Sequence, residues 1–400
     1  MRVLFTTPIL EHPATGGPQL RIENSIKALS GECTLDLFYR APRESDLSAE
    51  AADYYRSLCR EFVMSEFGGL SRNRYLRKVQ RTLSEDIRRE ALLLIEHVDR
   101  FHIGAVWFGY GNISFPLIRR ISRARPGLKL VCDTDSVWSR FILRELPHAS
   151  GLRRHGIRLA GHAKEREERL WVDLCDITTA VSEVDADYYR SIASRPERVR
   201  VFSNVIDIDS YRQAPPPPPG LQRPAIYLAG TFGHYHSPMD TAARWILEEV
   251  LPLVRRSIPD LHFYIVGKDS DKGFGHIRDP RITVTGTLPS VLPYLCNIDI
   301  ALVPLHFESG TRFKILEAGA CGIPLVSTTL GAEGLPAIDG KHLLIADSAS
   351  DFASAIIRLL HDRQLASSLA ANCRDLVEQN YSIDSLARQA RAILHCLEEK

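Results

Sequence analysis

Residues 308–327 combine charged residues and glycines in a spacing that can bind an anion. They follow an apolar run at residues 298–303, and the pattern predicts a strand, a polar loop, a helix and a second buried strand. Unpaired backbone N–H groups at a helix start attract anions, and the cations Arg312 and Lys314 lie beside this start. Glu317, further along the helix, can accept hydrogen bonds from a ribose diol. These residue types predict a site for the diphosphate and ribose of a nucleotide.

The loop before this helix contains further candidate ligands. Ser309 and Thr311 can cap the helix, Gly310 lies between them, and Glu308 precedes all three. The Gly-Ile-Pro sequence at residues 322–324 ends the helix before the next strand. The charged residues of the helix also have a plainer interpretation, as solvent-facing side chains or partners in surface salt bridges.

Length and composition describe an ordinary globular protein. A chain of 400 residues exceeds what one hydrophobic core usually supports, which predicts two domains of roughly 150 to 200 residues each. With 44% apolar residues, 25% charged residues and a formal net charge of +1, nothing draws the whole chain toward nucleic acid. No apolar run approaches the roughly 20 residues that cross a bilayer, and residues 1–7 read as a strand rather than a signal peptide. We therefore expect a cytoplasmic protein.

Two further features bear on ligands and partners. The eight cysteines are scattered without a C-x-x-C pair, so neither a disulfide framework nor a zinc site is predicted. Three segments of the first half are basic: residues 72–81, 119–129 and 153–169. They are either solvated helix faces or contacts with an anionic lipid surface, which would make the protein membrane-peripheral.

Short apolar runs alternate with longer amphipathic stretches, which is the βαβ pattern of parallel sheets covered by helices. The pattern predicts two sets of strands. The first set is residues 3–7, 35–39, 105–108, 129–133, 177–181 and 199–203. The second set is residues 225–229, 262–266, 282–285, 299–303, 325–327 and 343–345.

A polyproline run at residues 215–219 separates the two sets and cannot form helix or central strand. A single run of this kind between two domain-like halves is more often a linker than a docking motif for a partner. A break near residues 380–382 then separates the final helix. The predicted division is an N-terminal domain at 1–205, a linker at 206–223, a C-terminal domain at 224–381 and a final helix at 382–400.

Several short motifs in fixed order resemble the retaining GT-B glycosyltransferases of glycosyltransferase family four. The motifs are a junction segment at 203–207, glycine-bearing strand ends at 229–233 and 266–267, a helix opening at 238–245 and a Gly-Thr-Leu-Pro sequence at 286–289. The resemblance covers nearly the whole chain. It implies two Rossmann-like domains facing across a cleft, an N-terminal domain that binds the acceptor, a C-terminal domain that binds a nucleotide sugar, and a last helix that returns to the N-terminal domain.

The resemblance also implies roles for particular residues. Gly230 and Gly267 end donor-domain strands, and Leu288 lies where family members hold the nucleotide base. Gly16 and Gly17 open the first helix and are implied to approach the donor phosphates.

The chain departs from the commonest family pattern at two places. Ser309 stands where the family has a glutamate that contacts the donor sugar, with Glu308 displaced by one position. The usual Arg and Lys after the first donor-domain strand are replaced by His234, Tyr235 and His236, and His234 can hydrogen-bond phosphate at a strand end. The string Gly-Thr-Arg-x-Lys-x-x-Glu at 310–317 is similar to a subgroup that makes surface polysaccharides and related glycoconjugates, in which Arg312 and Lys314 substitute for the missing pair.

Acceptor residues are expected at strand ends of the first half. Asp133 and Asp135 follow one strand and can orient or deprotonate an acceptor hydroxyl, although Asp135 can equally cap a helix. Residues 109–112 end another strand and can line the acceptor pocket.

Transfer from a nucleotide sugar needs cations and N–H groups that stabilise the departing diphosphate. No carboxylate stands out as a nucleophile, and the resemblance favours front-face substitution in which the leaving phosphate takes the acceptor proton. We expect no tightly bound cofactor and no metal. A non-catalytic nucleotide-binding or scaffold protein of the same fold is the alternative, and an epimerase is a weaker one. A nicotinamide-dependent dehydrogenase is disfavoured, because no Gly-x-Gly-x-x-Gly follows the first strand of either half.

Overall fold

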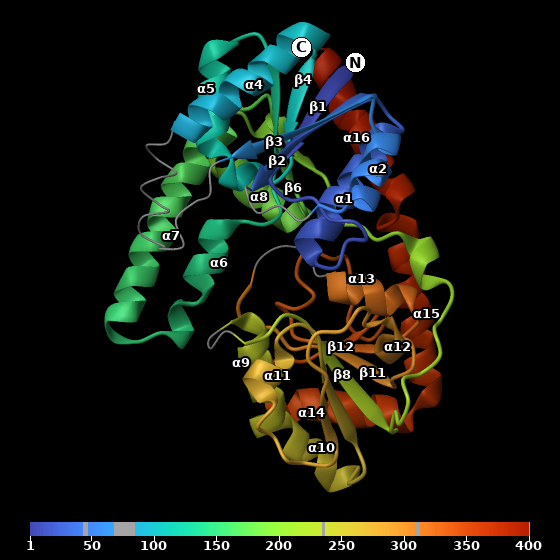
Figure 1. Cartoon of the computed structure of the whole chain (residues 1–400). Coiled ribbons are helices and arrows are strands. Elements are labelled where there is room, and N and C mark those ends of the chain that lie inside the picture. The colour runs from blue at the N-terminus through green and yellow to red at the C-terminus, as the bar shows by residue number, and fades with distance from the viewer. Residues whose placement is uncertain (43–46, 68–84, 234–236, 309–312, 400) are drawn as a thin grey trace. The chain divides into compact units, whose positions relative to one another are not determined.

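The computed structural model describes residues 1–42, 47–67, 85–233, 237–308 and 313–399. Two compact units make up the chain. The first contains Met1–Asn204 together with Ile383–Lys400, and the second contains Val205–Ser382. Each unit is built on one sheet of parallel strands with helices around it (Figure 1).

The first unit has a seven-stranded sheet in the order β3-β2-β1-β4-β5-β6-β7. All of its pairings are parallel. The strands are β1 (Arg2–Thr7), β2 (Thr34–Pro42), β3 (Glu61–Phe67), β4 (Ala105–Phe108), β5 (Lys129–Asp133), β6 (Ile177–Ala180) and β7 (Val199–Val201). The α-helices are α1 (Gly17–Ser30), α2 (Ala49–Leu58), α4 (Glu85–Phe101), α5 (Phe115–Ala124), α6 (Trp138–Arg144), α7 (Gly151–Val172), α8 (Glu183–Ile192) and α16 (Ile383–Glu398).

The central strands of this sheet are buried along almost their whole length. Parallel strands covered on both faces bury both sets of alternating side chains, which explains why they appear in the sequence as continuous apolar runs. Leu4, Val106 and Leu130, from three neighbouring strands, share one apolar cluster with Ile118 of α5 and Trp171 of α7.

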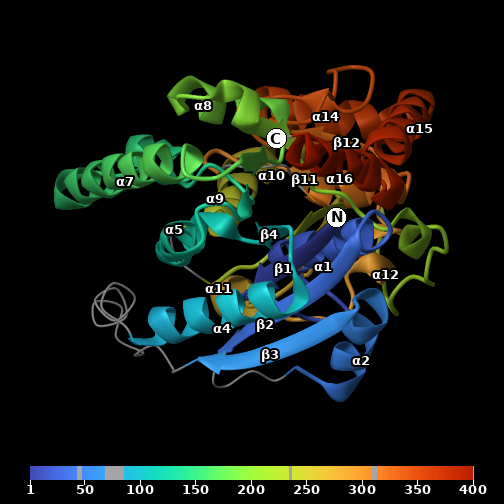
Figure 2. The ribbon, with the colours of Figure 1, turned by 90° about the horizontal axis from the view of Figure 1, so that it is seen from above.

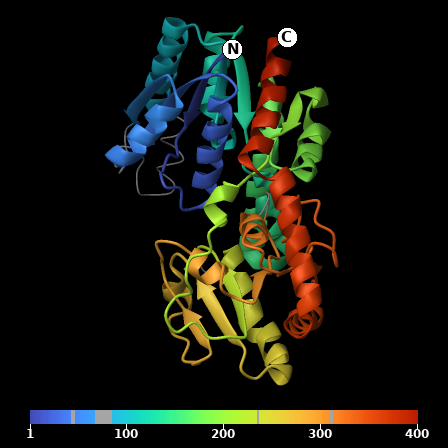
Figure 3. The same ribbon diagram turned by 90° about the vertical axis from the view of Figure 1, so that its right-hand side faces the viewer.

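The last helix belongs to the first unit, as predicted. α16 packs beside α1 and buries Leu386, Ala390 and Ile393 (Figure 3). Ion pairs join Arg391 of α16 to Glu32 at 2.7 Å and the amino group of Met1 to Glu398 at 3.1 Å. The chain therefore leaves the first unit after Asn204 and returns to it at Ile383.

The second unit has a six-stranded sheet in the order β10-β9-β8-β11-β12-β13, again parallel throughout. The strands are β8 (Ala225–Ala229), β9 (His262–Val266), β10 (Ile282–Val284), β11 (Ile300–Val303), β12 (Leu325–Ser327) and β13 (Leu344–Ile345). The helices are α9 (Pro238–Trp245), η5 (Ile246–Val250, a π-helical turn), α10 (Leu251–Ser257), α11 (Ser270–Phe274), α12 (Leu292–Leu295), α13 (Phe313–Ala320), α14 (Ala349–His361) and α15 (Arg363–Asn380).

Residues 206–223, expected to form a linker, are bonded to the second unit. The Ile206 N–H donates to the Tyr381 carbonyl at 3.0 Å, and the Gln222 N–H donates to the Tyr264 hydroxyl at 2.7 Å. The Asn297 amide also donates to the Pro215 carbonyl at 3.0 Å, inside the polyproline run. The segment is therefore part of the second unit's structure rather than a free connection.

The sequence pattern did not predict the edge strand β3. This strand lies at the end of its sheet, and its sequence EFVMSEF has polar residues on both sides of a short apolar stretch. Met64 of this strand is 50% exposed. A strand covered on fewer sides needs no continuous apolar sequence, so the rule that identified the central strands missed this one.

None of the helices in the described part of the chain combines the length and the apolar composition that a bilayer crossing needs.

Candidate functional site

The second sheet has a point where its strand order reverses. From β8 the chain passes to β9 and β10 on one side, and it then crosses to β11 on the other side. The loops after two such neighbouring strands diverge, and ligands of open parallel sheets bind in the crevice that this leaves at the carboxyl ends. The expected ligand position of the second unit is therefore where β8 and β11 end.

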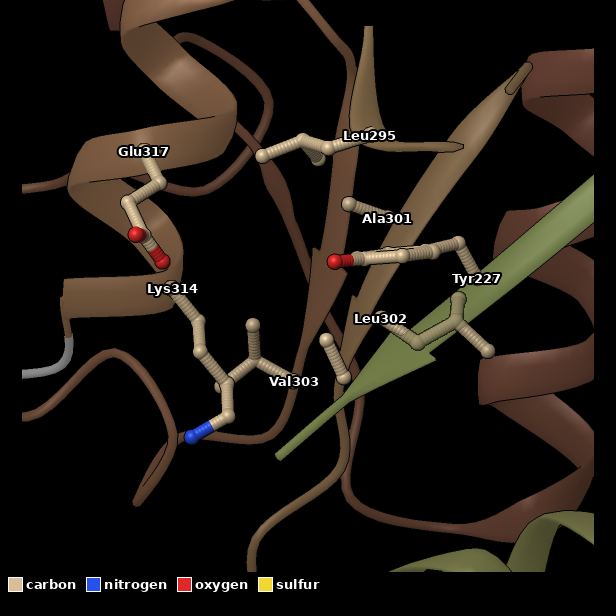
Figure 4. A pocket seen from close by; sticks show the side chains of 8 residues that line it. Tyr227, Leu295, Ala301, Leu302, Val303, Lys314 and Glu317 are labelled. Atoms are coloured by element: carbon tan, nitrogen blue, oxygen red, sulfur yellow. The ribbon is translucent and has the colours of Figure 1, made fainter. Parts of the chain in front are cut away.

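A hollow lies at this position (Figure 4). Its walls come from β8, β11, α12 and α13. The lining residues are Tyr227, Ala229, Leu295, Ala301, Leu302, Val303, Lys314 and Glu317.

The two charged residues of the hollow lie three positions apart on α13 and so on one face of that helix. The Glu317 carboxylate and the Tyr227 hydroxyl point toward each other across the hollow, whereas the Lys314 amine points away past Val303 (Figure 4). Burial raises the pKa of Tyr227, and the nearby charge of Glu317 raises it further.

Glu317 receives a hydrogen bond from a residue that the sequence did not connect with it. The Tyr211 hydroxyl, at the end of the 3₁₀ turn η4 (Ile208–Tyr211), donates to Glu317 Oε1 at 3.1 Å. Burial raises the pKa of Glu317, while the charge of Lys314 and the bond from Tyr211 act in the opposite direction. The carboxylate therefore lies in a poorly solvated position, where a hydrogen bond donated by a ligand gains strength.

Several predicted ligands cannot be placed. Ser309, Gly310, Thr311 and Arg312 lie outside the described residues, and so does His234. Glu308 is half-buried just before them. The roles assigned to these residues stay predictions.

The glycines that follow β8 and β9 are explained by close approach of their loops. Gly267 has φ +123°, and a Cβ there would lie 2.3 Å from the Gly230 carbonyl oxygen. A Cβ on Gly230 would lie 2.8 Å from a side-chain carbon of Met239. Leu288 packs against the core of the second unit. These contacts account for the residues through packing, and donor binding by their backbone stays a prediction.

The first sheet reverses between β1 and β4, and the predicted glycines follow β1. Gly17 is the first residue of α1, and Gly16 precedes it in extended conformation. No side chain caps this helix, and its first turn contains no acidic residue. Apart from Pro18, which has no N–H, the first turn of α1 can therefore offer backbone N–H groups to an anion without a competing carboxylate.

Asp133 is fully buried at the end of β5 and is already bound. It forms an ion pair with Arg21 of α1 and accepts a hydrogen bond from the Thr179 hydroxyl at 2.5 Å. Arg21 also donates to Asn204 Oδ1 at 2.8 Å. Burial raises the pKa of Asp133, and the charge of Arg21 lowers it. This network ties three parts of the first unit together, and it argues against the prediction that Asp133 deprotonates an acceptor hydroxyl.

Asp135 lies in a different, half-buried position near the end of β5. It accepts hydrogen bonds from the Asn112 amide and from Trp138 Nε1, the latter at 3.1 Å. Tyr110 adopts left-handed backbone geometry with φ 60°, and its pKa is raised by burial and by the charge of Asp135. Strained backbone of this kind is concentrated at functional sites. This group, next to the point where the first sheet reverses, is the better candidate for acceptor contact.

Among the described residues, no three His, Cys, Asp or Glu side chains gather in an arrangement that could hold a metal ion. Metal independence of any reaction stays a prediction.

Comparison with known proteins identifies the second unit. Residues 225–362 match the sequence model of the family described as glycosyl transferases group 1. We refer to this matched segment as the group 1 domain. The N-acetyl-alpha-D-glucosaminyl L-malate synthase of Bacillus anthracis is 27% identical over 124 residues, which cover 30% of this chain and 32% of that protein. The chain thus matches about a third of the length of this curated relative.

Several solved structures resemble this chain over almost its whole length. Sucrose-phosphate synthase from Thermosynechococcus elongatus has a TM-score of 0.73 at 16% identity and covers 100% of both chains. HepE of Anabaena in complex with UDP-glucose has a TM-score of 0.67 at 13% identity and covers 99% of both chains. WaaG, a glycosyltransferase involved in lipopolysaccharide biosynthesis, has a TM-score of 0.63 at 14% identity and covers 98% of this chain and 99% of its own. These likenesses confirm the predicted GT-B architecture of two Rossmann-like units.

The sequence predicted that Lys314 and Glu317 of the group 1 domain share one site, and the structure places both at the hollow. The sequence predicted no role for Tyr211 or Tyr227. Tyr211 lies 106 positions from Glu317 in a segment expected to be a linker, and Tyr227 lies inside an apolar strand. Tyr227 could have been identified from its place on β8, the strand at which the strand order of the sheet reverses. The sequence held no such signal for Tyr211.

Proposed function

We propose that this chain is a retaining glycosyltransferase of the family-four type. It moves a sugar from a nucleotide-diphosphate sugar to a hydroxyl acceptor in polysaccharide or glycoconjugate synthesis. The match of residues 225–362 to the group 1 family supports this proposal. The observation that carries it is the position of Glu317 on α13, at the hollow where the second sheet reverses.

The donor is proposed to bind with its ribose hydroxyls on Glu317 and its diphosphate at the start of α13. Lys314 and Arg312 supply cations there, and Arg312 can hold phosphate oxygens bidentately. The backbone at Gly230, Gly267 and Leu288 is proposed to hold the base and phosphates. The Gly-Thr-Arg-x-Lys-x-x-Glu string at 310–317 supports the proposal that the chain belongs to the corresponding subgroup. Because the HepE structure contains UDP-glucose, a UDP-sugar is the first donor to test.

The chemistry asked of these residues is electrostatic. As the bond between sugar and phosphate breaks, negative charge grows on the diphosphate, and fixed cations and N–H groups stabilise it. The bond from the acceptor oxygen to the sugar carbon forms on the same face, and the acceptor proton passes to the departing phosphate oxygen. No protein nucleophile, tightly bound cofactor or metal is assigned. The product keeps the anomeric configuration of the donor.

The acceptor is proposed to approach from the first unit. Asp135, with its hydrogen-bonded neighbours Asn112 and Trp138, can accept a hydrogen bond from the acceptor hydroxyl. Gly16 and Gly17 at the start of α1 are proposed to approach the donor phosphates. A cytoplasmic location and contact of the basic first unit with a membrane surface complete the proposal.

Two measurements on the pure protein test it. A thermal-shift screen of UDP, GDP, ADP and their sugars should raise the apparent melting temperature for one nucleotide class, because a ligand that binds only the folded state stabilises it. The stabilising donor is then incubated with a panel of sugar, hydroxy-acid and lipid-linked acceptors. Product with retained configuration supports the enzyme. Binding without hydrolysis or transfer supports the non-catalytic alternative. The reason for that alternative is that Ser309 replaces the family glutamate.

A further inference from the structure

Helix α7 exposes large apolar side chains on the side that faces away from the protein. Leu152 is 93% exposed, Leu159 61% and Leu170 63%. Their spacings of 7 and 11 residues bring all three onto one stripe of the helix. The buried positions Gly161 and Glu168 lie about 160° to 180° around the helix from this stripe. The leucine stripe is therefore the outermost line of α7, which extends away from the sheet of the first unit (Figure 2).

A stripe of this kind is unusual on a water-facing helix. Leucine is among the residues most often buried, and exposed apolar side chains that gather on one face commonly mark an interaction site. From Leu152 to Leu170 the stripe runs over about 27 Å of helix. The apolar face that holds α7 to the protein is separate from it, because Trp171 and Val172 are buried in the core of the first unit. The leucine stripe is therefore not needed for packing of α7.

Basic residues follow the leucine stripe on one side. His155, Arg158, His162, Arg166 and Arg169 lie about 40° to 120° around the helix from it. The whole helix contains six Lys or Arg residues against three Glu, which is a net charge of +3.

The ion pairs of α7 neutralise only part of this positive charge. Arg169 pairs with Glu165 at 3.0 Å, and Lys164 pairs with Glu167 at 2.8 Å. Arg158 and Arg166 are exposed and form no ion pair with any described residue. Their charge is therefore available to an anionic partner.

We propose that the leucine stripe and its basic flank bind an anionic membrane surface. An interfacial helix places its leucines at the boundary between headgroups and acyl chains, and its arginines contact lipid phosphates. A second copy of this chain fits less well, because pairing two leucine stripes would also bring like-charged flanks together. The inference rests on the proposed membrane contact of the first unit and assigns it to α7. It does not depend on the donor site of the group 1 domain, so the transfer reaction and the membrane contact can fail separately.

Cosedimentation with lipid vesicles tests this proposal on the full chain. Wild-type protein should bind phosphatidylcholine vesicles that contain phosphatidylglycerol, and should bind pure phosphatidylcholine vesicles about tenfold less. Added salt should weaken the binding, since it screens the arginines. L152S/L159S and R158Q/R166Q should each reduce binding to the anionic vesicles by about tenfold.

Matched variants separate position from composition. L92S/I338S removes two leucine-like side chains that are 66% and 55% exposed outside α7, and R256Q/R358Q removes two exposed arginines of the second unit. Both should bind vesicles like wild type, and all four variants should keep the wild-type melting temperature. Equal binding of both vesicle types by wild-type protein, or wild-type binding by L152S/L159S, would overturn the proposal. Sedimentation velocity adds an arm: a wild-type dimer that L152S/L159S abolishes would assign the leucine stripe to a protein interface instead.

Discussion

Replacing Glu317 by glutamine removes one charge and little volume from the hollow of the second unit. A hydrogen bond to a charged group contributes about 1.5 to 3 kcal/mol, against about 0.5 to 1.5 kcal/mol for a neutral pair. Glutamine can still accept from a hydroxyl, so about 1 to 1.5 kcal/mol is lost for each of the two ribose hydroxyls. We expect E317Q to bind the donor roughly 30- to 150-fold more weakly, with a matching fall in kcat/KM.

The same change should not destabilise the protein. Burial raises the pKa of Glu317 above its ordinary 4.5. A carboxyl with a raised folded-state pKa contributes stability that is fully present below the unfolded pKa and is lost as pH rises through the folded pKa. Above that pH range the ionised carboxylate therefore costs stability, and glutamine does not. E317Q should unfold at the wild-type temperature or above it at neutral pH, and this difference should close below about pH 4.

Calorimetric titration with the donor nucleotide and scanning calorimetry at two pH values measure both effects. The matched control is E248Q, since Glu248 is exposed on another helix of the second unit. The reasoning is refuted if E317Q binds the donor like wild type. It is refuted equally if E317Q melts well below wild type at neutral pH, because Glu317 would then be a structural ion-pair partner.

Four other substitutions follow from the same geometry. Y211F removes the hydroxyl that donates to Glu317 and should raise the donor KM by about three- to tenfold, with a smaller effect on kcat, measured by initial rates. D133N leaves the buried Arg21 without its counter-charge and should cost about 3 to 5 kcal/mol of unfolding free energy, measured by urea titration; a loss within about 1 kcal/mol would contradict the assigned structural role. G267A forces a Cβ to 2.3 Å from a carbonyl oxygen at φ +123°, so it should destabilise the protein by about 2 kcal/mol or more in the same titration. D135N should lower transfer about tenfold while nucleotide binding is unchanged; weakened nucleotide binding would contradict the proposed contact of Asp135 with the acceptor.

The sequence was enough to predict the fold because the central strands have a local signature. Strands such as β4 and β8 are buried on both faces, so each is a short apolar run with recognisable boundaries. β3 is different, because an edge strand can keep polar residues such as Glu61 on its open side. Local patterns also carry no information about distant partners. The bonds that attach residues 206–223 to the second unit join groups up to 175 positions apart, as in Ile206 to Tyr381.

In the candidate site, too, the sequence predicted which residues of one helix lie together, but not which distant residues contact them. Spacing on one helix is a local property, so the sequence alone assigns Lys314 and Glu317 to one face of α13. Asp133 and Asp135 both follow β5, and the sequence could not say which one would be buried. That depended on Arg21, 112 positions away, which folds against Asp133 and removes it from solvent.

The central claim is that a nucleotide diphosphate binds where β8 and β11 end in the second unit. A crystal structure of the protein with a saturating nucleoside diphosphate tests this most directly. We predict the ribose hydroxyls within hydrogen-bond distance of the Glu317 carboxylate and the diphosphate at the start of α13. Density for the nucleotide at another place, or none at all with Glu317 still bonded to Tyr211, would contradict the account.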